Sequence, residues 1–87
     1  MLFLGSAHSR QELLRLTDLG ADAAVLGPVK PTATHPGAAA LGWPGFEAQS
    51  AWTSLPVYAI GGLSPTDLDH AHRHGAQGIA AISSYWS

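Results

Sequence analysis

Short apolar runs alternate along the chain with longer stretches in which apolar residues recur at the spacing of one helix face. The runs cover residues 2–4, 23–26, 57–60 and 79–82, and a glycine or a serine follows each of them. Runs of this length that are apolar throughout are typical of strands buried in a parallel sheet. The sequence therefore predicts four parallel strands.

Three stretches between these runs carry helix signals. In the first, Ser9 and Glu12 have the spacing of a capping box, and leucines that form an apolar face follow. In the last, Ser64 is the expected N-cap and Asp67 is the acidic residue three positions later. The middle helix, residues 43–54, has the weakest signal. The pattern predicts one βα unit repeated along the chain.

Four strands and about three helices joined by short links favour an α/β fold with right-handed crossovers. Two architectures fit: a small open sheet, or half of a TIM-type (β/α)8 barrel. With 87 residues the chain is expected to form one domain, residues 1–87. An open half-barrel exposes two sheet edges and an apolar face, so we expect self-association into a homodimer or higher oligomer to complete it.

Composition excludes several classes of partner. A net charge of -2 with four basic residues gives no positive patch for nucleic acid or an anionic membrane. There is no cysteine, and His70 and His74, four residues apart, lack a third ligand in the pattern, so no metal site is expected. The opening five residues are too short for a signal sequence or a membrane span, which favours a cytoplasmic protein.

The loops after the strands carry the candidate chemistry, because function in parallel α/β folds lies at the carboxyl ends of strands. Gly61 and Gly62 allow a ligand to approach the backbone and expose amides beside a helix start, and Ser83 adds a hydroxyl. This combination suggests a phosphate site, although a simple tight turn is the alternative. His8 follows the first strand and could exchange a proton, although a loop histidine is more often structural.

The connection from residue 27 to residue 42 is longer than compact domains normally use. It contains Lys30, Thr32, Thr34 and His35, whose hydroxyl, imidazole and ammonium groups can bind phosphate oxygens. Alternatively, the three prolines of this segment only stiffen an exposed connection.

Five short segments occur in the order and spacing of one enzyme family. They are Ser6-Ala7-His8-Ser9, Gly27-Pro28-Val29-Lys30-Pro31-Thr32-Ala33-Thr34, Leu41-Gly42, Ile60-Gly61-Gly62 and Ala81-Ile82-Ser83. The chain resembles thiamine phosphate synthase and its relative, the thiazole tautomerase. The resemblance covers essentially the whole chain but only the latter half of the family's barrel, its fifth to eighth strands.

The resemblance implies a transferase of thiamine biosynthesis that couples a pyrimidine diphosphate to thiazole phosphate and expels pyrophosphate. It implies that the thiazole phosphate is held by Gly61, Gly62, Ile82 and Ser83. It implies that substrate or pyrophosphate is held by Ser6, Thr32, Thr34 and His35. The family's Mg2+ and diphosphate ligands belong to the first half of the barrel, so this half is expected to bind no cofactor, and Mg2+ is expected only for a complete barrel.

The resemblance leaves three functions open. In the first, the chain acts as a synthase together with a missing N-terminal half-barrel or a second copy. In the second, it acts as a metal-free thiazole tautomerase, with His8 as acid or base. In the third, it is a non-catalytic binding or oligomerisation module. His35 departs from the synthase pattern, which has a lysine there, and a mostly neutral imidazole would hold pyrophosphate less firmly.

Overall fold

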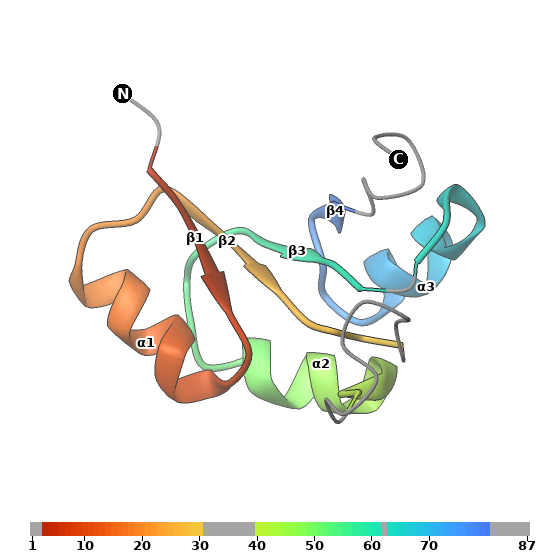
Figure 1. Cartoon of the computed structure of the whole chain (residues 1–87), viewed down its shortest axis with the longest axis horizontal. Coiled ribbons are helices and arrows are strands. Elements are labelled where there is room, and N and C mark those ends of the chain that lie inside the picture. The colour runs from red at the N-terminus through yellow and green to blue at the C-terminus, as the bar shows by residue number, and fades with distance from the viewer. Residues whose placement is uncertain (1–2, 31–39, 62, 81–87) are drawn as a thin grey trace.

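The computed structural model describes residues 3–30, 40–61 and 63–80. Its four strands form one parallel sheet in the order β1-β2-β3-β4 (Figure 1). The strands are β1 (Leu4–Ala7), β2 (Ala23–Leu26), β3 (Val57–Ala59) and β4 (Gly78–Ile79). The helices are α1 (Arg10–Asp18), α2 (Gly42–Ser50) and α3 (Leu68–Arg73), which the 3-10 turn η1 (Pro65–Asp67) precedes. The predicted parallel βα repeat is confirmed.

The predicted position of the first strand is wrong. We expected residues 2–4, but β1 begins at Leu4 and continues to Ala7. Its residues pair with β2 from Leu4 opposite Ala23 to Ala7 opposite Leu26. The neighbouring strand therefore sets the boundary of β1, because a parallel strand extends as far as it finds backbone partners.

The middle helix is shorter than residues 43–54, because α2 ends at Ser50. Beyond it, the hydroxyl oxygens of Thr53 and Thr17 are 2.8 Å apart, and Thr53 Oγ1 also accepts the Leu55 N–H at 3.1 Å. These bonds tie the chain to α1 and turn it toward β3. The contact between Thr53 and Thr17 thus accompanies the end of α2, at a point where the sequence has no clear helix stop signal.

The last two strands begin at or next to the predicted residues but end earlier than predicted. β3 ends at Ala59 rather than at residue 60, although the Ile60 N–H still donates to the Leu26 carbonyl at 3.1 Å. β4 begins at Gly78 rather than at residue 79 and ends at Ile79, so Ala80 is not part of it, and residues 81–82 lie outside the described residues.

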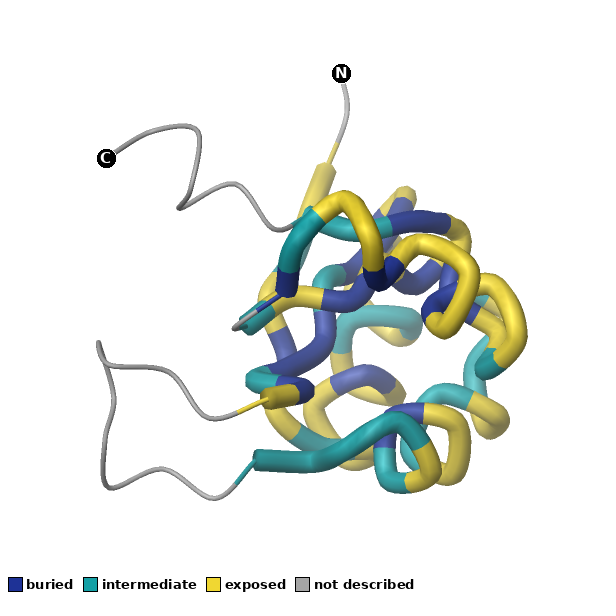
Figure 2. Tube along the Cα trace, turned by 90° about the vertical axis from the view of Figure 1, so that its right-hand side faces the viewer, coloured by how far each residue is buried: buried dark blue, intermediate teal, exposed yellow. Residues whose placement is uncertain are grey.

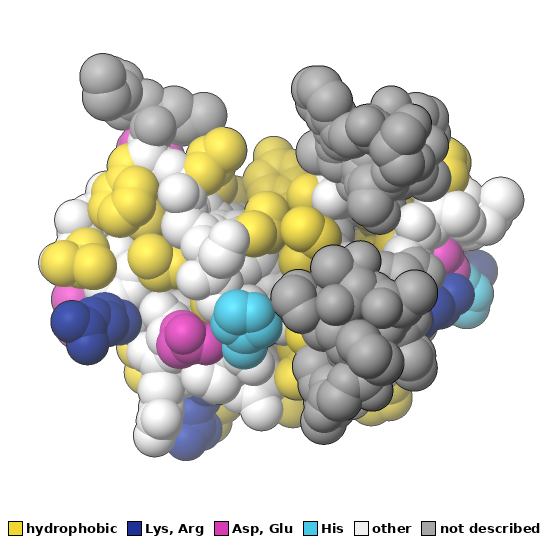
Figure 3. All heavy atoms as spheres, in the orientation of Figure 1, with side chains coloured by type: hydrophobic (Ala, Val, Ile, Leu, Met, Phe, Trp, Pro, Cys, Tyr) yellow, Lys and Arg dark blue, Asp and Glu magenta, His cyan; other side chains and the backbone are white. Residues whose placement is uncertain are grey.

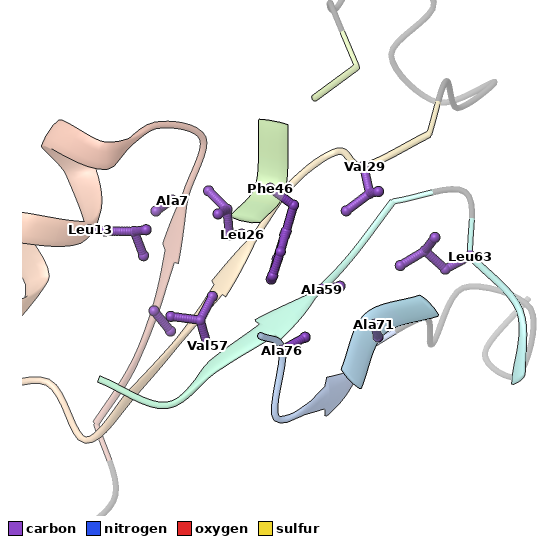
Figure 4. Packing of buried hydrophobic residues seen from close by; sticks show 11 residues of the cluster. Ala7, Leu13, Leu26, Val29, Phe46, Val57, Ala59, Leu63, Ala71 and Ala76 are labelled. Carbon is purple, nitrogen blue, oxygen red and sulfur yellow. The ribbon is translucent and has the colours of Figure 1, made fainter. Parts of the chain in front are cut away.

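The helices and one face of the sheet enclose a single apolar core (Figure 4). Its largest fully buried side chains are Leu13 from α1, Phe46 from α2, Leu26 from β2 and Val29 just beyond β2. Small residues such as Ala71 let α3 approach the sheet closely. Burial of this apolar face is the main force that holds the short strands in one sheet.

Among the residues that the structure describes, no helix packs on the opposite face of the sheet, and several residues of this face are exposed (Figure 2). Leu4, Tyr58 and Ile60 have exposed fractions of 58%, 36% and 37%. Ser6, Val25 and Tyr58 share one register row across β1, β2 and β3, and apolar side chains gather over the sheet in Figure 3. Within the described residues, the outer edges of β1 and β4 have no strand neighbour. None of the helices described combines the length and apolar character needed to cross a lipid bilayer.

Candidate functional site

The carboxyl ends of β2 and β3 continue to pair beyond the two strands. The Val29 N–H donates to the Ile60 carbonyl at 2.9 Å, and the Lys30 N–H donates to the Gly61 carbonyl at 3.1 Å. Backbone pairing of this kind holds the two loops in register. Lys30 and Gly61, which are distant in sequence, therefore lie side by side at the edge of the sheet where function is expected in parallel α/β folds.

The two ends of the long connection after β2 are held together. The Leu41 N–H donates to the Pro28 carbonyl at 2.8 Å, and the Gly42 N–H donates to the Val29 carbonyl at 2.7 Å. The base of this loop thus stands directly beside the pair formed by Lys30 and Gly61. Three of the predicted ligand residues, Thr32, Thr34 and His35, lie outside the described residues, so their assignment stays a prediction.

Gly61 has a φ of +103°, a conformation that residues with a side chain rarely adopt. A Cβ built on it would lie 2.5 Å from Pro28 Cα, closer than real contacts allow. The glycine therefore permits the close approach of the two loops. Its predicted role toward a phosphate stays untested, as do those of Gly62, Ile82 and Ser83, which lie outside the described residues.

A buried carboxylate joins the loops after β2 and β3. Asp67 has an exposed fraction of 7%, and its Oδ1 accepts a hydrogen bond from Lys30 Nζ at 2.8 Å. Its Oδ2 accepts the Ser64 N–H at 3.0 Å, the helix-start bond that the sequence predicts. The bond from Lys30, and next the bond from Ser64, lower the pKa of Asp67 although burial opposes them. Asp67 is therefore ionised at neutral pH.

Sequence reasoning missed the ion pair between Lys30 and Asp67. Each residue was assigned a local role, Lys30 as a loop cation and Asp67 as a helix-start acid. The two are 37 positions apart, and no local pattern links them. The one signal available was topological: in a parallel sheet the loops after two neighbouring strands meet at the same edge.

Ser6 and His8 lie at the other side of the sheet, on β1 and just after it, two strands away from Gly61. The His8 side chain is 70% exposed, and its Nδ1 lies 3.3 Å from Glu12 Oε1. The predicted capping box is half formed: Ser9 Oγ accepts the Glu12 N–H at 3.3 Å, but the Glu12 carboxylate accepts the His8 N–H at 2.7 Å. One carboxylate thus contacts both the backbone and the ring of His8.

His70 and His74 pack against an aromatic side chain. Their rings stack on Trp43, with centroid separations of 6.4 Å and 5.7 Å. His74 Nδ1 also lies 2.7 Å from the His70 carbonyl oxygen. These contacts explain the spacing of the two histidines through packing of α3 on α2.

The family of the chain follows from its sequence taken as a whole. The family model described as thiamine monophosphate synthase matches residues 2–85. The chain belongs to this family. A thiamine-phosphate synthase from Chloroflexus aurantiacus is 40% identical over 80 residues, which are 91% of this chain and 37% of that protein. One from Desulfitobacterium hafniense is 36% identical over 83 residues, covering 94% of this chain and 40% of that protein. The resemblance stated from the motifs is confirmed.

Comparison of structures agrees with the comparison of sequences. The thiamine phosphate pyrophosphorylase from Pyrococcus furiosus superimposes with a TM-score of 0.79 at 30% sequence identity, covering 93% of this chain and 38% of that chain. The predicted fold class, half of a TIM-type barrel, is confirmed. The chain spans well under half the length of these relatives of the thiamine monophosphate synthase family.

Proposed function

We propose that this chain is the phosphate-binding half of a thiamine phosphate synthase-like barrel and binds a phosphorylated thiazole in thiamine biosynthesis. The observation that carries the proposal is the pairing of residues 29–30 with residues 60–61, which brings the backbone of Lys30 beside Gly61, while its ammonium bonds Asp67 at the start of the helix that follows Gly61. A glycine-rich backbone and a nearby ammonium are the groups that suit a phosphate monoester. Membership of the family supports the same ligand class.

In this proposal each loop has a distinct task. The segment from Gly61 to Gly62 and the residues Ile82 and Ser83 hold the phosphate by backbone amides and a hydroxyl. Ser6, Thr32, Thr34 and His35 face the thiazole ring or, in a complete site, pyrophosphate. These groups bind and orient one substrate, which contributes to catalysis by fixing the attacking nucleophile relative to its partner.

The described residues do not fit a magnesium site. No three side chains of histidine, aspartate or glutamate gather within residues 3–30, 40–61 and 63–80. The buried carboxylate of Asp67 is already held by Lys30 and Ser64. We therefore derive no step through magnesium, and we propose that ligands for a metal and a diphosphate come from another half-barrel.

A second function, a thiazole tautomerase-like activity, is favoured by the contact between His8 and Glu12. A carboxylate near Nδ1 can fix the orientation of an imidazole, as a proton-transfer group requires. Such a reaction moves a proton on the thiazole carboxylate phosphate from one carbon to the histidine and back to another carbon of the same molecule. The same phosphate site would serve both functions.

We expect thiazole phosphate to raise the melting temperature of the purified chain, because a ligand that binds only the folded state stabilises it. At a concentration of 100 times Kd the gain is about 2.7 kcal/mol. The unphosphorylated thiazole alcohol is the control and should give a much smaller shift. Equal shifts with both compounds, or no shift with either, would contradict a phosphate site. Formation of thiamine phosphate, or isomerisation lost in His8→Ala, separates the synthase from the tautomerase.

The partner that we propose is a second copy of the chain. In the described part of the chain β1 and β4 are the outer strands of a parallel sheet, so β4 of one copy can pair with β1 of the other. Joining both edges closes eight strands and buries Leu4, Tyr58 and Ile60. This arrangement closes the sheet into a barrel that can hold thiazole phosphate, but the described residues of a second copy bring no magnesium site, so coupling to a pyrimidine diphosphate would need a different half-barrel.

Light scattering should give a mass of twice 9.0 kDa at micromolar concentration. Tyr58→Lys should dissociate the dimer, because a charge on the uncovered face would be buried without a partner. Leu14→Lys is the matched control, since Leu14 is an exposed leucine on α1 away from that face. A stable folded monomer of the unaltered chain would contradict the proposal, and so would dissociation by both substitutions alike.

A further inference from the structure

Lys30 has a setting unlike that of the other basic residues of the chain, Arg10, Arg15 and Arg73. Arg10 places its guanidinium 5.1 Å from the centre of the Trp52 ring. Lys30 instead lies where the loops after β2 and β3 join, with its backbone N–H bonded to the Gly61 carbonyl. Its ammonium bonds Asp67 in the turn that follows Gly61, so its charge is held at the start of the last helix.

The ammonium of Lys30 bonds a buried carboxylate, while its side chain is partly exposed to solvent. Its side chain is 45% exposed, while that of Asp67, its partner at 2.8 Å, is 10% exposed. An ammonium carries three N–H donors, and Asp67 takes one within the described part of the chain. The paired carboxylate is therefore on the buried side, and the donors that remain can reach solvent or a ligand.

Anchoring changes what a lysine can contribute to binding. A free lysine side chain loses rotamer freedom when it contacts a ligand, and this loss weakens affinity. Here the bond to Asp67 restricts Lys30 before a ligand arrives. Asp67 is restrained in turn by the Ser64 N–H at 3.0 Å, so the position of the ammonium is tied to the start of the helix that follows Gly61.

We propose that Lys30 is the cation that recognises the phosphate of the ligand, and that Asp67 is its positioning residue. The proposal rests on the proposed function and adds its specificity determinant: Lys30 makes the site select the phosphate ester over the neutral alcohol. One or more ammonium hydrogens bond a phosphate oxygen while another stays on Asp67. No covalent step is involved.

The test is calorimetric titration with thiazole phosphate, the thiazole alcohol and inorganic pyrophosphate. We expect Lys30→Met to weaken binding of thiazole phosphate about tenfold or more, because a charge-assisted hydrogen bond is lost. Binding of the alcohol should not change. Lys30→Arg should keep most of the preference for the phosphate ester. If Lys30→Met does not fold, Lys30→Gln replaces it, because glutamine is neutral but keeps a donor toward Asp67.

Arg15→Met removes the same charge from an exposed position on α1 and is the control for net charge. Equal losses in Lys30→Met and Arg15→Met, or no loss in Lys30→Met, would overturn the role of Lys30 while the proposed function stands. If the unaltered chain binds pyrophosphate but not thiazole phosphate, and Lys30→Met loses pyrophosphate, the proposed function fails and Lys30 is an anion-binding residue without the selectivity proposed for it. Binding of neither compound overturns both.

Asp67→Asn tests the positioning role. We expect it to reduce the preference for thiazole phosphate over the alcohol about threefold to tenfold, because a neutral amide holds the ammonium less firmly. A purely structural role would lower stability and weaken both ligands alike. An unchanged preference in this variant would remove Asp67 from the proposal.

Discussion

Replacing Gly61 with alanine should destabilise the fold by about 2–5 kcal/mol and abolish phosphate binding. The residue has a φ of +103°, which costs a side-chain-bearing residue about 1–2 kcal/mol. The new Cβ would also stand 2.5 Å from Pro28 Cα and 2.6 Å from Pro28 Cβ. Because a backbone atom and a rigid ring cannot move aside cheaply, the two loops must separate. Urea denaturation and thiazole phosphate titration measure the two effects.

Gly75→Ala is a matched control for this substitution. Gly75 has a φ of +89°, but a Cβ built there meets nothing within 4 Å. It should therefore show the cost of the backbone conformation alone, about 1–2 kcal/mol, and leave ligand binding intact. If the two variants were equally stable, the close approach of the loops at Pro28 would not be a significant constraint.

Truncation of Phe46 to alanine should cost about 3–5 kcal/mol, much of the stability available to a domain of this size. Phe46 is fully buried and is the largest such side chain among the residues described. It also meets the Trp43 ring edge to face at a centroid distance of 5.9 Å. The cavity left behind would remove contacts between α2 and the sheet, so we expect thermal unfolding at a much lower temperature.

Trp52→Ala removes a still larger aromatic side chain, but one that is 64% exposed. Its contact with Arg10 is worth about 0.5–1 kcal/mol at an exposed site, so the loss should be no greater than that. A loss comparable with that of Phe46→Ala would show that the turn after α2 contributes as much to stability as the core does.

The order of elements could be predicted from the sequence, because the apolar pattern of each strand or helix involves residues that are close together along the chain. Apolar runs such as residues 23–26 have a strand's length and no polar face, so they can be recognised as buried strands without knowledge of the fold. The start of the last helix could also be predicted, since the Asp67 carboxylate accepts the Ser64 N–H within one turn. The end of α2 could not, because the bond between Thr53 and Thr17 joins separate elements.

The candidate site divides in the same way. Gly61 was found from sequence because a glycine pair after a buried strand is a local signal of a special backbone. The role of Glu12 was predicted only in part, since its carboxylate bonds the residue before the N-cap. The family could be named from motifs, since they occur in a specific order and spacing, and the whole-chain match confirms it.

By itself the sequence determined the parallel βα order from patterns within about one element's length, and the half-barrel class and the family from the order and spacing of its motifs. Only the tertiary structure decided the register of β1 on β2 and the pair formed by Lys30 and Asp67. Both depend on residues brought together across the sheet. A partner 37 positions away leaves no periodic trace in the chain, because Coulomb attraction depends on distance in space and not on separation in sequence.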